Sequence, residues 1–286
     1  MRVAGCLLVA CLACACAKQS VTPQAANTSH TATTQAAQRI VSLAPNLTEL
    51  IYAVGAESAL VATVEYADYP AAAKQLPRVG DAFRVDLERL VALKPDLVLV
   101  WTSGTSATTV AQIQALGLHV VSIDAARLQD VSSAVLQVGE LTGHTTEATQ
   151  VAAQFTQGID ALRAQYADAI PLQVFVAVNR QPLYTINGQH LISDVLGVCG
   201  GVNVFADLKQ LAPSVSVESV LQRNPQVMVS TDGTLAEVQA DWHAWQSIDA
   251  VRNHHVYVVS PDTTTRATPR LLQGVADMCA ALAAAR

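Results

Sequence analysis

One pattern of residues occurs twice in this chain, first over residues 86–100 and again, 130 positions later, over residues 216–230. Each copy has a residue that can cap a helix, a Glu two positions later, a short apolar helix pattern, and a Pro seven residues after the Glu. An apolar stretch typical of a buried strand then follows. The repeat predicts two similar lobes, in which Glu88 and Glu218 occupy equivalent positions.

Two further pairs of segments match in the same order along the chain. Residues 48–56 resemble residues 193–201, and residues 120–124 resemble residues 258–262. The alternative is that α/β units look alike in general. The length of 286 residues also allows about two domains at ~150 residues each.

Strand and helix patterns alternate along both halves of the chain, which is typical of mostly parallel sheet. Between the halves, apolar residues spaced three or four apart over residues 145–167 predict one long helix. We therefore predict an α/β fold with two similar Rossmann-like lobes, residues 38–143 and 170–286. A bridging helix within residues 144–169 joins them, and a ligand cleft lies between the carboxyl ends of the strands.

Capping chemistry predicts where two of the helices begin. Asn46 can cap a helix that starts at Leu47. Thr268 and Pro269 are expected to open the last helix, because Thr caps helices and Pro suits the first helical position.

The N-terminal segment has the features of an export signal. Residues 1–17 begin with Arg2 and continue with apolar and small residues, too few to span a bilayer as a helix. Cleavage after a small-x-small site is one reading, and lipidation at Cys11 or Cys16, as in bacterial lipoproteins, is the other. Residues 18–37 are polar and lack periodicity, so they predict a disordered linker.

Two of the six cysteines, Cys199 and Cys279, lie far from the N-terminal group. An exported chain enters an oxidising compartment, where we expect these two to pair and close a long loop. Two buried free thiols are the alternative.

Several functional classes are not expected. The net charge is −6, which argues against a nucleic-acid partner, since such a partner requires a basic stripe. Neither a Gly-x-Ser-x-Gly motif nor a phosphate-binding loop with its Lys is present, and the seven His lack the spacing of metal ligands. We therefore predict neither catalytic residues nor a metal site.

Aromatic residues make up only 5% of the chain, yet several lie near the predicted cleft. Flat side chains there favour a large, flat or apolar ligand, although local packing is the alternative for any one of them. Two charged residues at the same end could hydrogen-bond an amide or carboxylate rim of the ligand, or form a loop-anchoring ion pair. The candidate ligand-binding residues are Tyr66, Phe83, Trp101, Tyr184, Asp262 and Arg266.

The repeated carboxylates allow two interpretations. Glu88 and Glu218 each follow a helix cap, where a negative charge interacts favourably with the helix dipole. They are also a matched pair that could dock onto arginines of a two-fold partner.

Residue motifs along most of the chain resemble those of one protein family. They are residues 39–45, 48–50, 66–70, 87–98, Trp101, 198–201, Asn203, Phe205, 266–270 and Cys279. With them, residues 39–286 resemble the substrate-binding proteins of ABC importers whose two lobes are joined by a single long helix. The residue 66–70 loop, Trp101 and the Cys-Gly-Gly segment with a late Cys are most similar to the members that bind cobalamin.

The resemblance implies a periplasmic carrier, possessing no cofactor of its own, that is a monomer when free and closes little around its ligand. A corrinoid such as cobalamin would bind in the cleft as the transported ligand. The resemblance also implies that Cys199 pairs with Cys279, and that Glu88 and Glu218 grip the permease dimer in the inner membrane. The residues it places against the corrinoid are Tyr66, Trp101, Tyr184, Asp262 and Arg266.

The chain departs from the cobalamin-binding pattern at Ala82, at Ala212 and in residues 262–266, which lack the aromatics of that pattern. Ala82 and Ala212 stand where the cobalamin-binding pattern has tryptophans, and the neighbouring Phe83 is a substitute for the first of them. Haem or a ferric siderophore is therefore the alternative ligand, with Tyr66 as a candidate axial ligand. An enzyme acting on a cell-envelope substrate is the third hypothesis.

Overall fold

The computed structural model describes residues 36–81 and 84–286, and these belong to one compact unit. The predicted signal segment, nearly all of the predicted linker, and Ala82 with Phe83 lie outside the described residues. None of the described helices is both long and apolar enough to cross a membrane.

The N-terminal lobe is built on a parallel four-stranded sheet in the order β2-β1-β3-β4. Its strands are β1 (Ile40–Ser42), β2 (Leu60–Ala62), β3 (Leu97–Trp101) and β4 (Val120–Ile123). The central strands β1 and β3 are buried at nearly every position, as expected for a sheet covered on both faces.

The C-terminal lobe repeats this arrangement with the order β6-β5-β7-β8, again parallel. Its strands are β5 (Leu172–Ala177), β6 (Gly201–Asn203), β7 (Val227–Ser230) and β8 (Val256–Val258). Both lobes therefore place their first strand second in the sheet and their third strand beside it. The predicted fold of two similar α/β lobes is confirmed.

The residue pattern that occurs twice marks equivalent units of the two lobes. Helix α2 (Leu87–Ala92) precedes β3, and helix α7 (Val217–Arg223) precedes β7. Each begins with a side-chain cap: Asp86 accepts a hydrogen bond from the N–H of Arg89 (3.0 Å), and Ser216 accepts one from Ser219 (3.3 Å). The shared capping chemistry explains why both copies of the repeat begin a short helix directly after their capping residue.

The other helices cover the two sheets. In the N-terminal lobe they are α1 (Pro45–Ala53), α3 (Ala107–Ala115) and α4 (Asp130–Thr142), with the short 3-10 helices η1 (Glu57–Ala59) and η2 (Ala71–Gln75). In the C-terminal lobe they are α6 (Leu191–Val198), α8 (Leu235–Trp242), α9 (Asp249–Arg252), α10 (Pro261–Thr264) and α11 (Leu271–Ala284).

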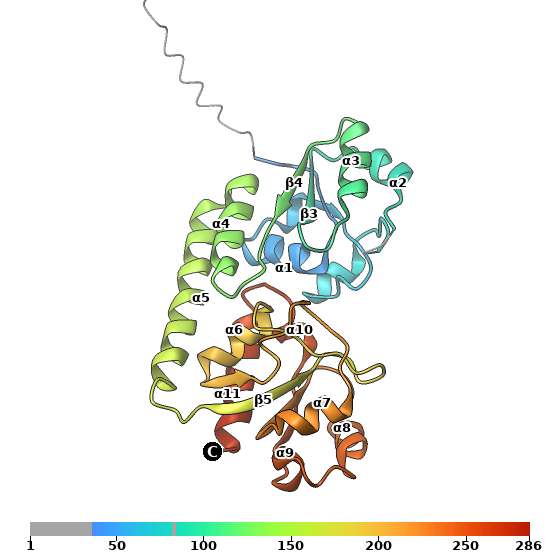
Figure 1. Cartoon of the computed structure of the whole chain (residues 1–286). Coiled ribbons are helices and arrows are strands. Elements are labelled where there is room, and N and C mark those ends of the chain that lie inside the picture. The colour runs from blue at the N-terminus through green and yellow to red at the C-terminus, as the bar shows by residue number, and fades with distance from the viewer. Residues whose placement is uncertain (1–35, 82–83) are drawn as a thin grey trace, which may run out of the picture. The chain divides into compact units, whose positions relative to one another are not determined.

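Helix α5 (Thr145–Gln165) leads from one lobe to the other and runs along one side of the unit (Figure 1). Its 21 residues correspond to about 32 Å at the rise of an α-helix. Gly143, with a φ of 76°, ends α4 in the left-handed conformation that suits glycine, and α5 packs back against α4. α5 also contacts α6 and α11, so it is attached to both lobes.

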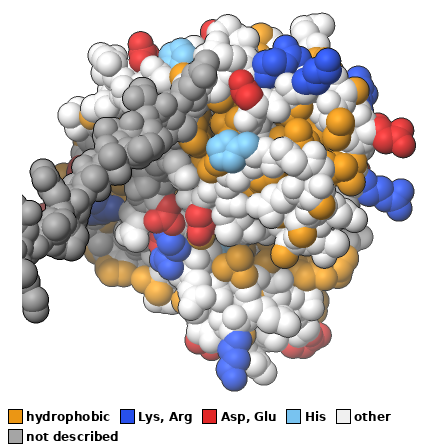
Figure 2. All heavy atoms as spheres, turned by 90° about the horizontal axis from the view of Figure 1, so that it is seen from above, with side chains coloured by type: hydrophobic (Ala, Val, Ile, Leu, Met, Phe, Trp, Pro, Cys, Tyr) orange, Lys and Arg blue, Asp and Glu red, His pale blue; other side chains and the backbone are white. Residues whose placement is uncertain are grey.

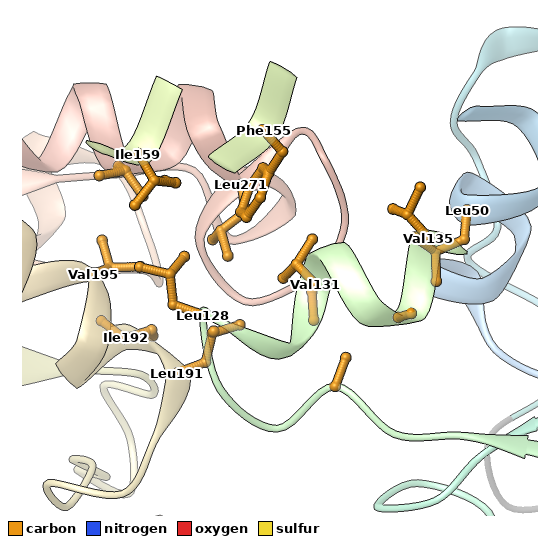
Figure 3. Close-up of a cluster of buried hydrophobic side chains, with 14 of the residues drawn as sticks. Leu50, Leu128, Val131, Val135, Phe155, Ile159, Leu191, Ile192, Val195 and Leu271 are labelled. Carbon is orange, nitrogen blue, oxygen red and sulfur yellow. The ribbon is translucent and has the colours of Figure 1, made fainter. Parts of the chain in front are cut away.

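A continuous apolar core crosses from one lobe to the other (Figure 3). Phe155 and Ile159 of α5 lie between Val131 and Val135 of α4 on one side and Val195 of α6 on the other. Because close-packed side chains resist displacement, rotating one lobe against the other would open cavities in this core. The shared core predicts a stiff connection between the lobes.

Both capping predictions are wrong. Helix α1 begins at Pro45 with Ala44 in the cap position, and Asn46 therefore lies inside the first turn without a capping hydrogen bond. Proline's preference for the first helical position moved the helix start two residues earlier than predicted, from Leu47 to Pro45. The last helix, α11, begins at Leu271, and the hydroxyl of Thr268 instead donates a hydrogen bond to Glu49 (3.0 Å).

Cys199 and Cys279 form a disulfide, with their Cα atoms 4.9 Å apart. The bond ties the end of α6 to the middle of α11, and both cysteines are fully buried. It therefore links a helix beside the strands of the C-terminal lobe to a helix that contacts α5.

Replacing both cysteines, as Cys199→Ala with Cys279→Ala, is expected to lower the free energy of unfolding by about 4–5 kcal/mol, because the unfolded chain loses a long covalent loop. Urea unfolding of the oxidised protein and of the double variant measures the difference. The unaltered protein unfolded under a thiol reductant should lose a similar amount. An unchanged unfolding midpoint in both comparisons would contradict the prediction.

Candidate ligand-binding site

A cavity of about 360 Å³ lies between the lobes, at the carboxyl ends of their strands. The N-terminal lobe contributes residues 43–46, which follow β1, and Trp101 with Gly104 and Thr105 at the end of β3. The C-terminal lobe contributes His190 and residues 265–267. Open α/β sheets bind ligands at this edge, so the cavity is the candidate site.

Trp101 forms one wall of the cavity and is fixed by the turn that follows it. The N–H of Gly104 donates to the carbonyl oxygen of Trp101 at 3.1 Å, which folds the chain back over the indole. A Cβ atom at Gly104 would lie 2.3 Å from Cε3 of Trp101, so only glycine fits beneath the ring. Among the described residues, Trp101 Nε1 is the buried side-chain polar atom that lacks a hydrogen-bond partner.

A buried carboxylate holds the two lobes together beside the cavity. Glu49, on α1 of the N-terminal lobe, is only 3% exposed. Its carboxylate accepts hydrogen bonds from Arg266 (2.8 Å), Arg270 (3.0 Å) and Thr268 (3.0 Å), all from the C-terminal lobe. A buried charge is tolerated when it is paired and hydrogen-bonded, and this one finds its partners across the lobe boundary.

Arg266 has three further acidic or carbonyl contacts. It forms ion pairs with Asp68 (3.1 Å) and Asp262 (3.0 Å), and it donates to the carbonyl oxygen of Tyr66 (3.4 Å). Burial lowers the pKa of Arg266, but the hydrogen bonds to Glu49 and Asp68 outweigh it and raise this pKa above its usual range. The guanidinium is therefore permanently charged, and the surrounding carboxylates already balance its charge.

Hydrogen bonds from Arg78 hold the loop that carries Tyr66. Tyr66 has a φ of 65°, uncommon for a large side chain, and it is 78% exposed. Arg78 donates to the carbonyl oxygens of Val64 (2.8 Å) and Ala67 (3.0 Å) on either side of it. Strained residues with exposed side chains that their surroundings hold in place are a recurrent feature of binding sites.

A second ion pair links the lobes away from the cavity. Arg127, at the start of the segment leading into α4, forms a salt bridge with Asp194 on α6. The same carboxylate also accepts from the N–H of Leu128 at 3.1 Å. These contacts stand beside the apolar core of Figure 3, to which Leu128 itself belongs.

The structure brings some of the predicted ligand-binding residues together. Trp101 and Arg266 line the same cavity, and Asp262 joins them through its ion pair with Arg266. The carbonyl oxygen of Tyr66 accepts a hydrogen bond from Arg266. Tyr184 is 36% exposed; its N–H donates to the carbonyl oxygen of Asn179, and its carbonyl oxygen accepts from the N–H of Val178, both at 2.9 Å. Their contact with a ligand stays a prediction.

The remaining predicted residues differ in what the structure shows of them. Tyr184 is not one of the residues that line the cavity. Phe83 lies outside the described residues. Glu88 and Glu218 are both exposed, each at the second position of its helix. Hydrogen bonds from its own backbone N–H and from Ser216 hold the pKa of Glu218 below its usual range.

Two polar cavity residues were missed by the sequence reasoning. Asn46 is 7% exposed and lines the cavity from the first turn of α1. His190 lines it from the N-cap of α6, where its Nδ1 accepts a hydrogen bond from the N–H of Ile192 at 3.1 Å. Pro45 was the available signal for Asn46, since Pro at the first helical position leaves the next side chain free of a capping role.

The part of the chain that the structure describes has no cluster of three or more His, Cys, Asp or Glu side chains that could hold a metal ion. On the face seen in Figure 2, acidic and basic side chains are interspersed and do not form a single stripe of one sign.

Comparison with known proteins gives a consistent result. The model of the family described as "Periplasmic binding protein" matches residues 40–263. The vitamin B12-binding protein of Vibrio cholerae serotype O1 is 35% identical over 244 residues, which covers 85% of this chain and 88% of that protein. This chain therefore belongs to the periplasmic binding protein family.

Two solved structures share the fold. The crystal structure of the periplasmic vitamin B12 binding protein BtuF of Vibrio cholerae matches with a TM-score of 0.81 and 34% identity, over 87% of this chain and 98% of that one. The periplasmic heme-binding protein RhuT from Roseiflexus sp. RS-1 matches with a TM-score of 0.78 and 24% identity, over 87% of this chain and 98% of that one. The second likeness shows the fold alone.

The variant Glu49→Gln is expected to lower the free energy of unfolding by about 2–4 kcal/mol, because it leaves two arginine charges without their shared buried carboxylate. The value lies below that of a fully buried pair, since both arginines keep some access to water. Chemical unfolding measures it.

The matched control for Glu49→Gln is Asp160→Asn. It removes the exposed ion pair with Arg163, in which the side chains are 63% and 58% exposed. A change of at most about 1 kcal/mol is expected there. Equal losses in the two variants would contradict the role given to Glu49.

Proposed function

We propose that this protein is the substrate-binding component of an ABC importer, and that it captures cobalamin or a related corrinoid between its lobes. The cavity that Trp101 and Arg266 line together is the observation that carries the proposal. Support also comes from relatives named vitamin B12-binding protein, which share about a third of their residues with this chain over most of its length. The protein acts by binding and release, with no chemical step.

The ligand would occupy a site that is already formed. Trp101 offers a flat apolar wall, and the exposed ring of Tyr66 stands on a pinned loop. The shared core and the ties of Glu49 resist lobe rotation, so we propose that the cleft changes little on binding. A preorganised site avoids the cost of ordering loops during association.

Glu88 and Glu218 are proposed to dock the carrier onto a permease dimer in the inner membrane. Both are exposed at the same step of equivalent helices, so the carrier offers a matched pair of carboxylates to a two-fold partner. Charge-assisted contacts with arginines would orient the complex and speed its formation. The protein would work in the periplasm, after removal or lipidation of its N-terminal segment.

Haem or a ferric siderophore is the second candidate ligand. The exposed phenol of Tyr66 at the edge of the site is the observation in its favour, because a tyrosine oxygen can ligate ferric iron. The balanced charge of Arg266 is against it, since that guanidinium has no unpaired charge to offer a carboxylate of haem.

Calorimetric titration of the mature protein with cyanocobalamin is expected to show one site and a dissociation constant of about 1 μM or below. The variant Trp101→Ala should weaken binding about tenfold or more, because it removes a large part of the apolar wall. Haem and a ferric siderophore serve as competing ligands. If cyanocobalamin gives no heat and haem gives a Soret shift, the corrinoid proposal is wrong.

Charge reversal at both docking residues, Glu88→Arg with Glu218→Arg, is expected to abolish corrinoid uptake by cells while leaving the dissociation constant for the corrinoid unchanged. The matched control is Glu147→Arg, since Glu147 is also exposed in the first turn of a helix, α5. Uptake assays and titrations measure the two effects. Loss of corrinoid affinity in the double variant, or an equal loss of uptake in the control, would count against the docking role.

A further inference from the structure

Besides Trp101, whose Nε1 has no partner, two side chains that line the cavity have polar atoms without a hydrogen-bond partner among the described residues. Asn46 is more than nine-tenths buried and lines the cavity, yet its amide makes no hydrogen bond within that part of the chain. His190 uses Nδ1 to cap α6, and its Nε2 has no partner there either. Neither group is among the fully buried unpartnered atoms, so the amide of Asn46 and Nε2 of His190 are open to the cavity, where a ligand can supply the missing hydrogen bonds.

The cap fixes which nitrogen of His190 carries the proton. Nδ1 accepts the hydrogen bond from Ile192, so in the neutral ring Nε2 is the N–H donor. Burial lowers the pKa of His190 and outweighs the opposing effect of Asp194, which keeps the ring neutral at neutral pH. His190 therefore presents a hydrogen-bond donor to the cavity, and its protonated Nε2 is not free to coordinate a metal.

The two residues lie one position apart when the two lobes are matched by the repeat. His190 lies three residues before Ser193, and Pro45, the neighbour of Asn46, lies three residues before Thr48 at the matching point of the repeat. Helices α1 and α6 thus both begin at the cavity, and each brings one unpaired polar side chain to it.

The polar groups left for a ligand are neutral. The charge of Arg266 is taken up by Glu49, Asp68 and Asp262. Asn46 offers a donor and an acceptor, and His190 offers a donor. A primary amide matches this set because it both donates and accepts, whereas a carboxylate only accepts. Cobalamin carries neutral amides around the rim of its corrin ring, and haem carries carboxylates.

We propose that Asn46 and His190 are specificity-determining residues that hydrogen-bond the neutral amides on the rim of a bound corrinoid. This inference rests on the proposed corrinoid function and adds to it the groups by which a corrinoid is distinguished from a haem.

The variants Asn46→Ala and His190→Ser test the proposal. Serine can still cap α6, so the second variant removes the cavity donor and keeps the helix start. Each variant is expected to raise the dissociation constant for cyanocobalamin about threefold to tenfold, as the loss of one hydrogen bond predicts. Matched controls are Asn253→Ala and His243→Ser, at exposed positions of the C-terminal lobe away from the cavity, and these should leave it unchanged.

A second measurement separates hydrogen bonding from a change of cavity shape. The variants and the unaltered protein are titrated with cyanocobalamin derivatives in which one rim amide has been hydrolysed to a carboxylate. If Asn46 contacts an amide, one of these derivatives should bind the unaltered protein more weakly than cyanocobalamin, and Asn46→Ala should not distinguish that derivative from cyanocobalamin.

The outcomes are distinct. Two results would overturn the roles of Asn46 and His190 while leaving the corrinoid function in place. One is that, for every derivative, the loss of affinity caused by Asn46→Ala and the loss caused by hydrolysing the amide simply add. The other is unchanged cyanocobalamin binding in both variants. A protein that binds no corrinoid at all would overturn the proposed function, and these roles with it. Thermal unfolding midpoints close to that of the unaltered protein would show that the weaker binding is not a loss of folding.

Discussion

The buried carboxylate of Glu49 is the contact on which the arrangement of the cleft depends. Its three hydrogen-bond donors all come from the segment of residues 266–270 in the other lobe. Through Arg266 the same network reaches Asp68 and the carbonyl oxygen of Tyr66, and the guanidinium of Arg270 lies 3.6 Å from the ring centre of Tyr69. The buried charge of Glu49 therefore positions both residues 266–270 and the loop that carries Tyr66 and Tyr69, because leaving this charge unpaired would cost several kcal/mol.

Helix α5 and the apolar core supply the frame around this contact. Phe155 and Ile159 pack against helices of both lobes, and the salt bridge of Arg127 with Asp194 adds a second tie. A frame of this kind also fixes the separation between Glu88 and Glu218. On the proposed function, the rigid arrangement of the two lobes would serve both ligand binding and permease docking. The ligand meets a preformed cleft, and the permease meets two carboxylates at a constant distance.

The architecture was predictable because its signals are local. The repeated caps, helix patterns and buried strands identified two similar lobes, and the spacing of apolar residues identified α5. Strand β6 was missed because three residues that begin with Gly201 carry too little pattern. The Glu49 network was not predictable, since its partners lie more than 200 positions away, as the separation of 217 between Glu49 and Arg266 shows. The assignment of Asn46 as a cap failed because a neighbouring Pro competes for the helix start, and that competition frees its amide for the cavity.

The partners of Arg266 change what the cleft can recognise. Considered from the sequence, Arg266 could either contact a ligand or anchor a loop, and the structure gives it a carboxylate on each lobe. A ligand carboxylate that paired with Arg266 would have to displace one of these partners, and displacing Glu49 would strand a buried charge. A neutral amide meets no such cost, because Asn46 offers it both a donor and an acceptor and His190 offers it a donor at the same cavity. On the proposed function, the residue that ties the lobes together would therefore also bias the site toward a ligand with a neutral rim.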